Sequence, residues 1–215
     1  MNLLTSLQQT ALTAFFAVPE LKQYFYLTGE TALAGFYLEH RVSDDLDFFT
    51  HGVEIYAIER IVEDAFKTAG LKLTKELGSP SFRRYKVNGE LQMDLVKDVE
   101  FRLGSPELRD GIMVDNLKNI AVNKVCAIYG RLDPKDYVDL FFLIPYLNLN
   151  VLELLDWAKR KDAGIDQFQW AKVIADVETI DVLPRMVKPL KPRDLKQFFH
   201  VLRDQVLDSL NPNSQ

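Results

Sequence analysis

The chain has 215 residues, of which 47% are hydrophobic and 27% are charged, and its formal net charge is −5. This balance is typical of a globular protein with a real core, and it argues against a broad surface that coats nucleic acid. Residues 1–16 lack the basic segment and cleavage site of a signal peptide, and no apolar run reaches the roughly 20 residues of a membrane span. Cys126 is the only cysteine, so we expect a cytoplasmic protein without an internal disulfide.

The first 115 residues predict an α+β lobe. Apolar spacing predicts helices, over residues 3–16, from Glu30 to about residue 40, and over 55–69. Aromatic or alternating runs predict strands, over residues 24–28, 45–49, 71–76, 82–87 and 91–98. Asn88-Gly89 lies between the last two runs and favours a type I′ hairpin. The sequence therefore predicts a sheet flanked by helices.

The remaining residues, 116–215, predict a helical lobe. Helical patterns occupy five segments, residues 116–129, 135–147, 151–161, 167–180 and 192–209. The first lobe has 12 basic and 18 acidic side chains, whereas this lobe has 14 basic and 13 acidic ones. Residues 185–203 contain six basic side chains against Asp194 alone, which makes this segment locally basic.

Three aspartates on predicted strands point to a metal site. Asp45 and Asp47 are two residues apart, so a strand directs both carboxylates to one face, where they repel each other. A hard divalent cation such as Mg²⁺ removes that repulsion. Asp94 is a lone acid in a strand otherwise built for burial, and a neighbouring strand could bring it beside the pair. Together they predict a two-metal site for phosphoryl chemistry, although such acids are also common on exposed strand faces.

A strand-to-helix turn lies just upstream, at "LTGETALAGF". Gly29 and Thr31 lie where a helix begins, and backbone N–H groups at such a point bind anions. We expect this turn to hold a triphosphate, with the Thr31 hydroxyl as a further donor. An ordinary helix cap, with Thr28 as the capping residue, is the alternative.

The segments "LTGETALA" and "EHRVSDDLDFF" resemble the signature of the AbiEii/AbiGii-type nucleotidyltransferase toxin family, a branch of the DNA polymerase β-like superfamily. That signature is a Gly-Gly-Thr/Ser-Ala-Leu turn followed by Arg-x-Ser-x-Asp-Leu-Asp-Phe. Its second part is matched in order by Arg41, Ser43, Asp45, Asp47 and Phe48. Asp94 resembles the family's third acid. Glu30 departs from the pattern, because it stands where the family has its second glycine.

A second part of the resemblance is "NKVCAIYGRLDPKDYVDLFFL", so that the match spans residues 24–143. It is similar to the family's Lys followed by Arg and a Lys/Arg-Asp-x-x-Asp-Leu element. The matching positions are Lys124, Arg131, Lys135, Asp136, Asp139 and Leu140. A lysine such as Lys124 can reach the β- and γ-phosphates as a point charge.

The resemblance implies a nucleotidyltransferase-like mixed sheet with flanking helices, followed by a helical lobe that completes the active site. It implies NMP transfer from an NTP with Mg²⁺ or Mn²⁺, an RNA acceptor of the tRNA class, and a cognate antitoxin as partner. The implied metal ligands are Asp45, Asp47 and Asp94. The implied nucleotide-binding residues are Gly29, Thr31, Arg41, Ser43 and Lys124. Asp136 and Asp139 complete the catalytic set by orienting Lys124 or the nucleotide.

Three other functions remain open from the sequence. A phosphohydrolase of the haloacid dehalogenase type would have Thr or Val at the position of Phe49, so this residue argues against that function. A metal-dependent nuclease accounts for the acids but not for the glycine turn or Lys124. A degenerate nucleotide-binding or protein-interaction module is favoured by Glu30. The three histidines are scattered, so a zinc site is not predicted.

Overall fold

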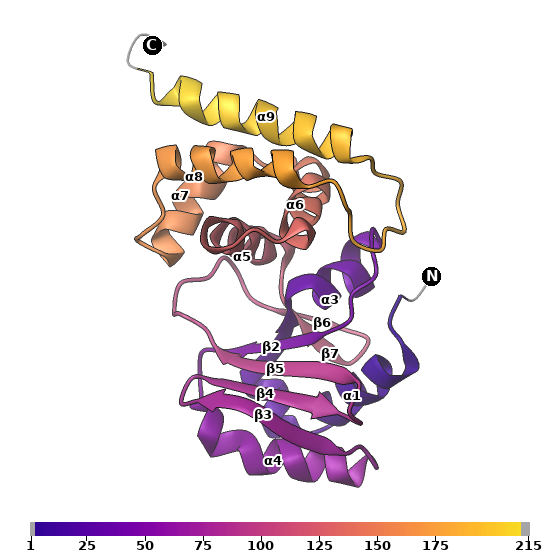
Figure 1. Ribbon diagram of the computed structural model, residues 1–215. Helices are drawn as coiled ribbons and strands as arrows, with labels where there is room; N and C mark the ends of the chain where they lie inside the picture. Colours follow the sequence, from indigo (N-terminus) through magenta and orange to yellow (C-terminus); the bar gives the residue numbers. More distant parts are fainter. Residues whose placement is uncertain (1–2, 212–215) are drawn as a thin grey trace. The chain divides into compact units, whose positions relative to one another are not determined.

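The computed structural model describes residues 3–211, which form two compact units that divide between Asn116 and Leu117 (Figure 1). The N-terminal unit is a mixed β-sheet with flanking helices, and the C-terminal unit is helical throughout. The predicted α+β class is therefore confirmed.

Within its described residues, the N-terminal unit holds a seven-stranded sheet in the order β3-β4-β5-β2-β1-β7-β6. The strands are β1 (Phe25–Thr28), β2 (Leu46–Thr50), β3 (Leu73–Ser79), β4 (Phe82–Val87), β5 (Leu91–Lys97), β6 (Glu107–Arg109) and β7 (Ile112–Val114). The pairs β2–β5 and β1–β7 are parallel, and the other neighbours are antiparallel. The helices are α1 (Ser6–Phe16), α2 (Pro19–Tyr24), α3 (Gly29–Leu33), a π-helical turn (Ala34–Leu38) and α4 (Ile55–Thr68).

One face of this sheet forms the core with α1 and α4. Phe48 of β2 stacks on Phe15 of α1 with the ring centroids 4.0 Å apart. Arg83 of β4 reaches Glu59 of α4, with Nε 2.8 Å from Oε1. Figure 1 shows α4 lying along this side of the strands. Because side chains alternate along a strand, the neighbours Asp47 and Arg84 point to the other face.

The structure also corrects the extent of one predicted helix and adds elements that the sequence did not predict. The predicted helix from Glu30 gives way after one turn to the π-helical turn and stops at Glu39, whose φ is 48°. Helix α2 and the hairpin of β6 and β7 were not predicted. Both hairpin strands have only three residues, which is too short for an alternating pattern, and their turn uses Asp110 and Gly111 at positive φ.

The C-terminal unit consists of α5 (Leu117–Gly130), α6 (Pro134–Leu147), α7 (Val151–Lys161), α8 (Gln167–Val173), a 3₁₀ turn (Ile174–Thr179) and α9 (Pro192–Ser209). Side-chain caps on Asp133, Asn150 and Asp166 begin α6, α7 and α8. Buried aromatic residues fill the core, with the Tyr137 and Phe199 rings 4.8 Å apart. The predicted helix over 167–180 is thus shorter, because its second half tightens into the 3₁₀ turn.

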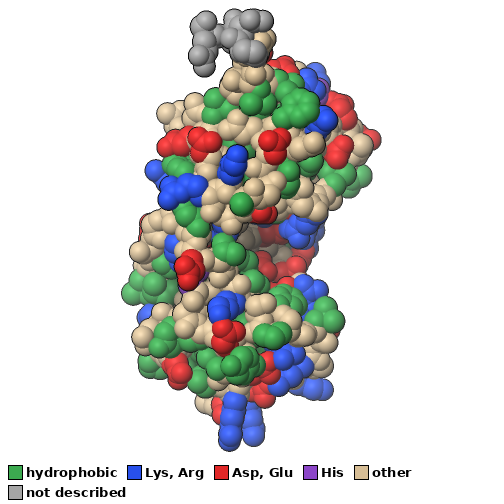
Figure 2. Space-filling view, turned by 90° about the vertical axis from the view of Figure 1, so that its left-hand side faces the viewer, with side chains coloured by type: hydrophobic (Ala, Val, Ile, Leu, Met, Phe, Trp, Pro, Cys, Tyr) green, Lys and Arg blue, Asp and Glu red, His purple; other side chains and the backbone are tan. Residues whose placement is uncertain are grey.

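Among residues 3–211, no single helix combines the length and apolar character needed to cross a membrane. The pair α6 and α7 passes together on length and composition, but the chain bends by 120° between them. On the face drawn in Figure 2, acidic and basic side chains are interspersed with hydrophobic ones.

Candidate active site

A row of polar residues crosses the sheet on the face opposite α1 and α4. The strand registers place Arg84 opposite Asp94, Asp94 opposite Asp47, and Asp47 opposite Thr28. Residues directly opposite each other share one face of a sheet. The carboxylates of Asp47 and Asp94 are therefore immediate neighbours on β2 and β5, whereas Asp45 precedes β2 and is half-buried.

Arg84 donates two hydrogen bonds to the carboxylate of Asp94. Its Nε donates to Oδ1 at 2.8 Å and its Nη2 to Oδ2 at 2.6 Å, and the Gln92 amide adds a longer contact of 3.3 Å. Hydrogen bonding to Asp94, which is 6% exposed, raises the pKa of the Arg84 guanidinium. The paired geometry is the strong fork-to-carboxylate kind.

Gly29 lies against the carboxylate of Asp47. A Cβ at this position would lie 2.7 Å from Asp47 Oδ2, and the Gly29 φ of +67° is one that other residues rarely adopt. Glycine therefore leaves room for the Asp47 side chain at the turn between β1 and α3.

Thr31 and Ser43 hold the segment that leads into β2. The Thr31 hydroxyl donates to the backbone carbonyl of Asp45 and lies 2.7 Å from the Ser43 hydroxyl. The carbonyl of Ser43 accepts a bond of 3.0 Å from Gln8 Nε2 on α1. Both hydroxyls are buried and used internally, so this geometry favours positioning of Asp45 over direct contact with phosphates.

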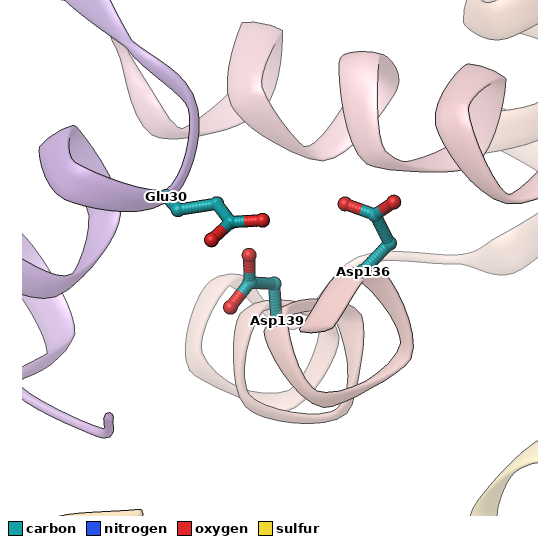
Figure 3. Close-up of side chains that lie close together, drawn as sticks. All are labelled: Glu30, Asp136 and Asp139. Carbon is teal, nitrogen blue, oxygen red and sulfur yellow. The ribbon is translucent and has the colours of Figure 1, made fainter. Parts of the chain in front are cut away.

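Arg41 is fully buried and lies 3.0 Å from Glu30, measured from Nη2 to Oε2. It also donates to the carbonyl of Val42 at 3.1 Å. Glu30 extends from the first turn of α3 (Figure 3). The acid at the family's glycine position is thus balanced by the arginine of the same signature.

The donor set beside Gly29 suits a hard divalent cation, because it consists of aspartate oxygens, two of them on paired strands. Glycine also leaves space for the Asp47 carboxylate where a Cβ would lie 2.7 Å from its Oδ2. Among the described residues, however, the oxygens of Asp45, Asp47 and Asp94 are not gathered within 4.8 Å of one another. The residues fit the ion in chemistry, and their side chains must reorient to ligate it together.

In the C-terminal unit, Lys124 is held between two buried carboxylates. Its Nζ lies 2.7 Å from Asp136 Oδ1 and 2.6 Å from Asp139 Oδ2, and Arg131 Nε lies 2.9 Å from Asp136 Oδ2. Asp136 and Asp139 are one turn apart and project from the same side of α6 (Figure 3). The structure thus brings these three predicted residues together, with Lys124 only 4% exposed.

The sequence did not single out a buried network behind the end of β1. Asp115 is fully buried and accepts bonds from Thr28 Oγ1 at 2.7 Å and Arg102 Nη2 at 2.8 Å. The Tyr37 hydroxyl donates to the Asp115 carbonyl at 2.7 Å. The Thr28 hydroxyl is therefore engaged here, and it does not cap α3. The only sequence signal was an acid directly after the short apolar run of β7.

Comparisons with known proteins agree with this architecture. A family model described as the nucleotidyl transferase AbiEii toxin of a type IV toxin–antitoxin system matches residues 10–209. An uncharacterised protein of Aquifex aeolicus, aq_aa25, is 32% identical over 152 residues, which cover 66% of this chain and 68% of that protein.

Two solved structures share the fold. The crystal structure of a Helicobacter pylori protein assigned as a candidate nucleotidyltransferase superposes with a TM-score of 0.63 at 19% identity, covering 95% of each chain. JHP933 from Helicobacter pylori gives a TM-score of 0.60 at 21% identity, over 97% of this chain and 92% of that one. With the family model matching most of its length, the chain belongs to the AbiEii family of nucleotidyl transferase toxins.

Proposed function

We propose that this protein transfers an NMP group from an NTP to an RNA acceptor with the help of a divalent cation. The observation that carries the proposal is the direct opposition of Asp47 and Asp94 on adjacent strands, beside a glycine turn that leaves room for the Asp47 carboxylate. Membership of a nucleotidyl transferase family supports the reaction class.

In this proposal, Asp47 and Asp94 hold Mg²⁺ or Mn²⁺ together with Asp45. A cation bound there supplies neutralisation of phosphate charge and alignment of the attacking and leaving oxygens. Asp94 accepts the proton of the acceptor hydroxyl. Thr31 and Ser43 fix the backbone at Asp45, and Arg41 braces the glycine turn through Glu30.

Lys124 is proposed as the cation for the leaving pyrophosphate. Asp136 and Asp139 support this role because they fix the ammonium group in one position. An ordered lysine loses less conformational freedom when it meets a phosphate than a mobile one does.

The acceptor and the partner are proposals of the same kind. Residues 185–203 are basic, and four of their six basic side chains are exposed, which suits phosphate contacts with RNA of the tRNA class. Several of these charges are shared with acids, since Lys196 lies 2.8 Å from Asp181 and Arg203 lies 2.9 Å from Asp204. The family's assignment to toxin–antitoxin systems supports a toxic activity and a cognate antitoxin.

The test is incorporation of labelled NTPs into total RNA by the full chain with Mg²⁺. We expect the wild type to label RNA, Asp47→Asn and Asp94→Asn to reduce labelling at least about a hundredfold, and the exposed neighbour Asp44→Asn to retain it. Addition of EDTA should abolish labelling.

Other outcomes separate the alternatives. Shortened RNA without label would indicate a nuclease. Nucleotide binding without transfer in the presence of Mg²⁺ would favour the degenerate binding module for which Glu30 argues.

A further inference from the structure

Both oxygens of Asp94 are already occupied by a cation that belongs to the chain itself. The two bonds from Arg84, at 2.8 and 2.6 Å, use one lone pair on each oxygen and place a positive charge beside the carboxylate. The side chain of Asp94 is 9% exposed and that of Arg84 is 30% exposed. The more exposed guanidinium is thus paired with an almost buried acid that the proposed function assigns to the metal.

The surroundings of Arg84 favour this position. Asp94, Asp45 and Glu76 all stabilise its charge, and the Phe82 ring lies 5.7 Å from its guanidinium carbon. Glu76 belongs to the irregular part of β3 between Lys75 and Leu77, on the neighbouring strand. Arg84 therefore sits among carboxylates on both sides, and leaving Asp94 does not leave it without acidic neighbours.

The adjacent Arg83 provides a natural comparison. It belongs to the same strand but points to the opposite face, where its Nε lies 2.8 Å from Glu59 Oε1 on α4. The two arginines have the same charge and neighbouring positions, and only Arg84 shares a face with Asp47 and Asp94.

We propose that Arg84 competes with the divalent cation for Asp94 and thereby sets the metal affinity of the Asp47–Asp94 pair. This inference rests on the proposed function, because it assumes that the cation binds these two acids. Two positive centres cannot both be held at full strength by one carboxylate, since each lowers the negative potential that attracts the other. In the nucleotide-free protein, the paired contact of Arg84 therefore weakens metal binding at Asp94, and metal binding in turn weakens that contact.

The competition predicts tighter metal binding when Arg84 is replaced. Mn²⁺ binding to the full chain without nucleotide is measured by electron paramagnetic resonance, with calorimetry as a second readout. We expect Arg84→Gln to bind Mn²⁺ about tenfold to a hundredfold more tightly than the wild type, the range that follows from removing one adjacent opposite charge. Arg84→Lys keeps the charge and should lie within about threefold of the wild type. Arg83→Gln should leave the affinity unchanged.

Unchanged or weaker Mn²⁺ binding by Arg84→Gln, with circular dichroism showing an intact fold, overturns the proposal. Equal tightening by Arg83→Gln overturns it too, because the effect would then be one of net charge. Asp94→Asn separates this failure from that of the proposed function. If Asp94→Asn abolishes binding while Arg84→Gln has no effect, the metal site stands and the competition does not. If Asp94→Asn also has no effect, both fail.

Discussion

The carboxylate of Glu30 lies 3.0 Å from the guanidinium of Arg41, whose side chain is fully buried. Glu30 stands where the family signature has a glycine, and an acid there repels phosphate unless its charge is balanced. Arg41 supplies that balance from the second half of the same signature. The pair shows how the turn can carry an acid without exposing its full charge.

Glu30→Gln should therefore destabilise the protein. The substitution removes the charge of one partner from a buried arginine, and breaking such a pair costs about 3 kcal/mol in the free energy of unfolding. Thermal unfolding followed by circular dichroism measures the effect, with the exposed Glu20→Gln as the control. Equal stability of the two variants would show that Glu30 does not support Arg41.

Gly29→Ala should lose at least about tenfold in nucleotidyl transfer and about 1–2 kcal/mol in stability. The new Cβ meets Asp47 Oδ2 at 2.7 Å in addition to the strain at positive φ. Gly70→Ala is a matched control, because Gly70 has a φ of +72° with open space around its Cβ position. It should show the backbone cost with unchanged transfer. Identical transfer in the two variants would contradict the crowding of Asp47.

Lys124→Met should lower the free energy of unfolding of the C-terminal unit by about 3 kcal/mol. The change removes the ammonium group from the buried carboxylates of Asp136 and Asp139. Both tryptophans belong to this unit, so urea unfolding followed by their fluorescence reports on it. The exposed Lys159→Met is the control. Adding Asp139→Asn to Lys124→Met should recover part of the loss, and strict additivity would exclude the coupling.

The lowered pKa of Glu59 predicts that the stability of the N-terminal unit depends on pH. Burial alone raises its pKa, but hydrogen bonds from Lys75 and Arg83 outweigh that effect and lower it. A lowered pKa stabilises the fold above the unfolded-state value of about 4.3, and this contribution disappears as the pH falls through the folded-state value. Glu59→Gln should thus be about 1 kcal/mol less stable than the wild type at pH 7 and equally stable in acid. A constant difference from pH 7 to pH 2 would contradict this assignment.

Much of the N-terminal unit could be predicted because its strands obey local rules. Apolar alternation placed β2, β4 and β5 within about a residue, and Asp47 and Asp94 fell on their polar faces. The pairing of β2 with β5, in contrast, could not be predicted from the sequence. Helix α4 and two strands separate them in the chain, so a local pattern cannot tell which strand lies beside which.

The hairpin between β4 and β5 shows why the sequence did not predict the pairing of Arg84 with Asp94. Asn88 and Gly89 both have positive φ and Glu90 N bonds to Val87 O at 3.0 Å, as a type I′ turn requires. A two-residue loop would place Arg83 opposite Asp94. The strands instead begin pairing at Val87 and Leu91, and this shift of one residue brings Arg84 to Asp94. A single-residue shift changes the face of every side chain, and only the three-dimensional register reveals it.

The parallel register of β2 and β5 also bears on when the protein can become active during synthesis. The carboxylate of Asp47 lies beside that of Asp94 only after β5 has been synthesised and has folded back to pair with β2, which is made earlier. Long-range closure of this kind is among the slower events of folding. A nascent or truncated chain that ends before β5 carries the signature aspartates yet lacks Asp94, and is therefore expected to be inactive if the paired acids are what the reaction needs.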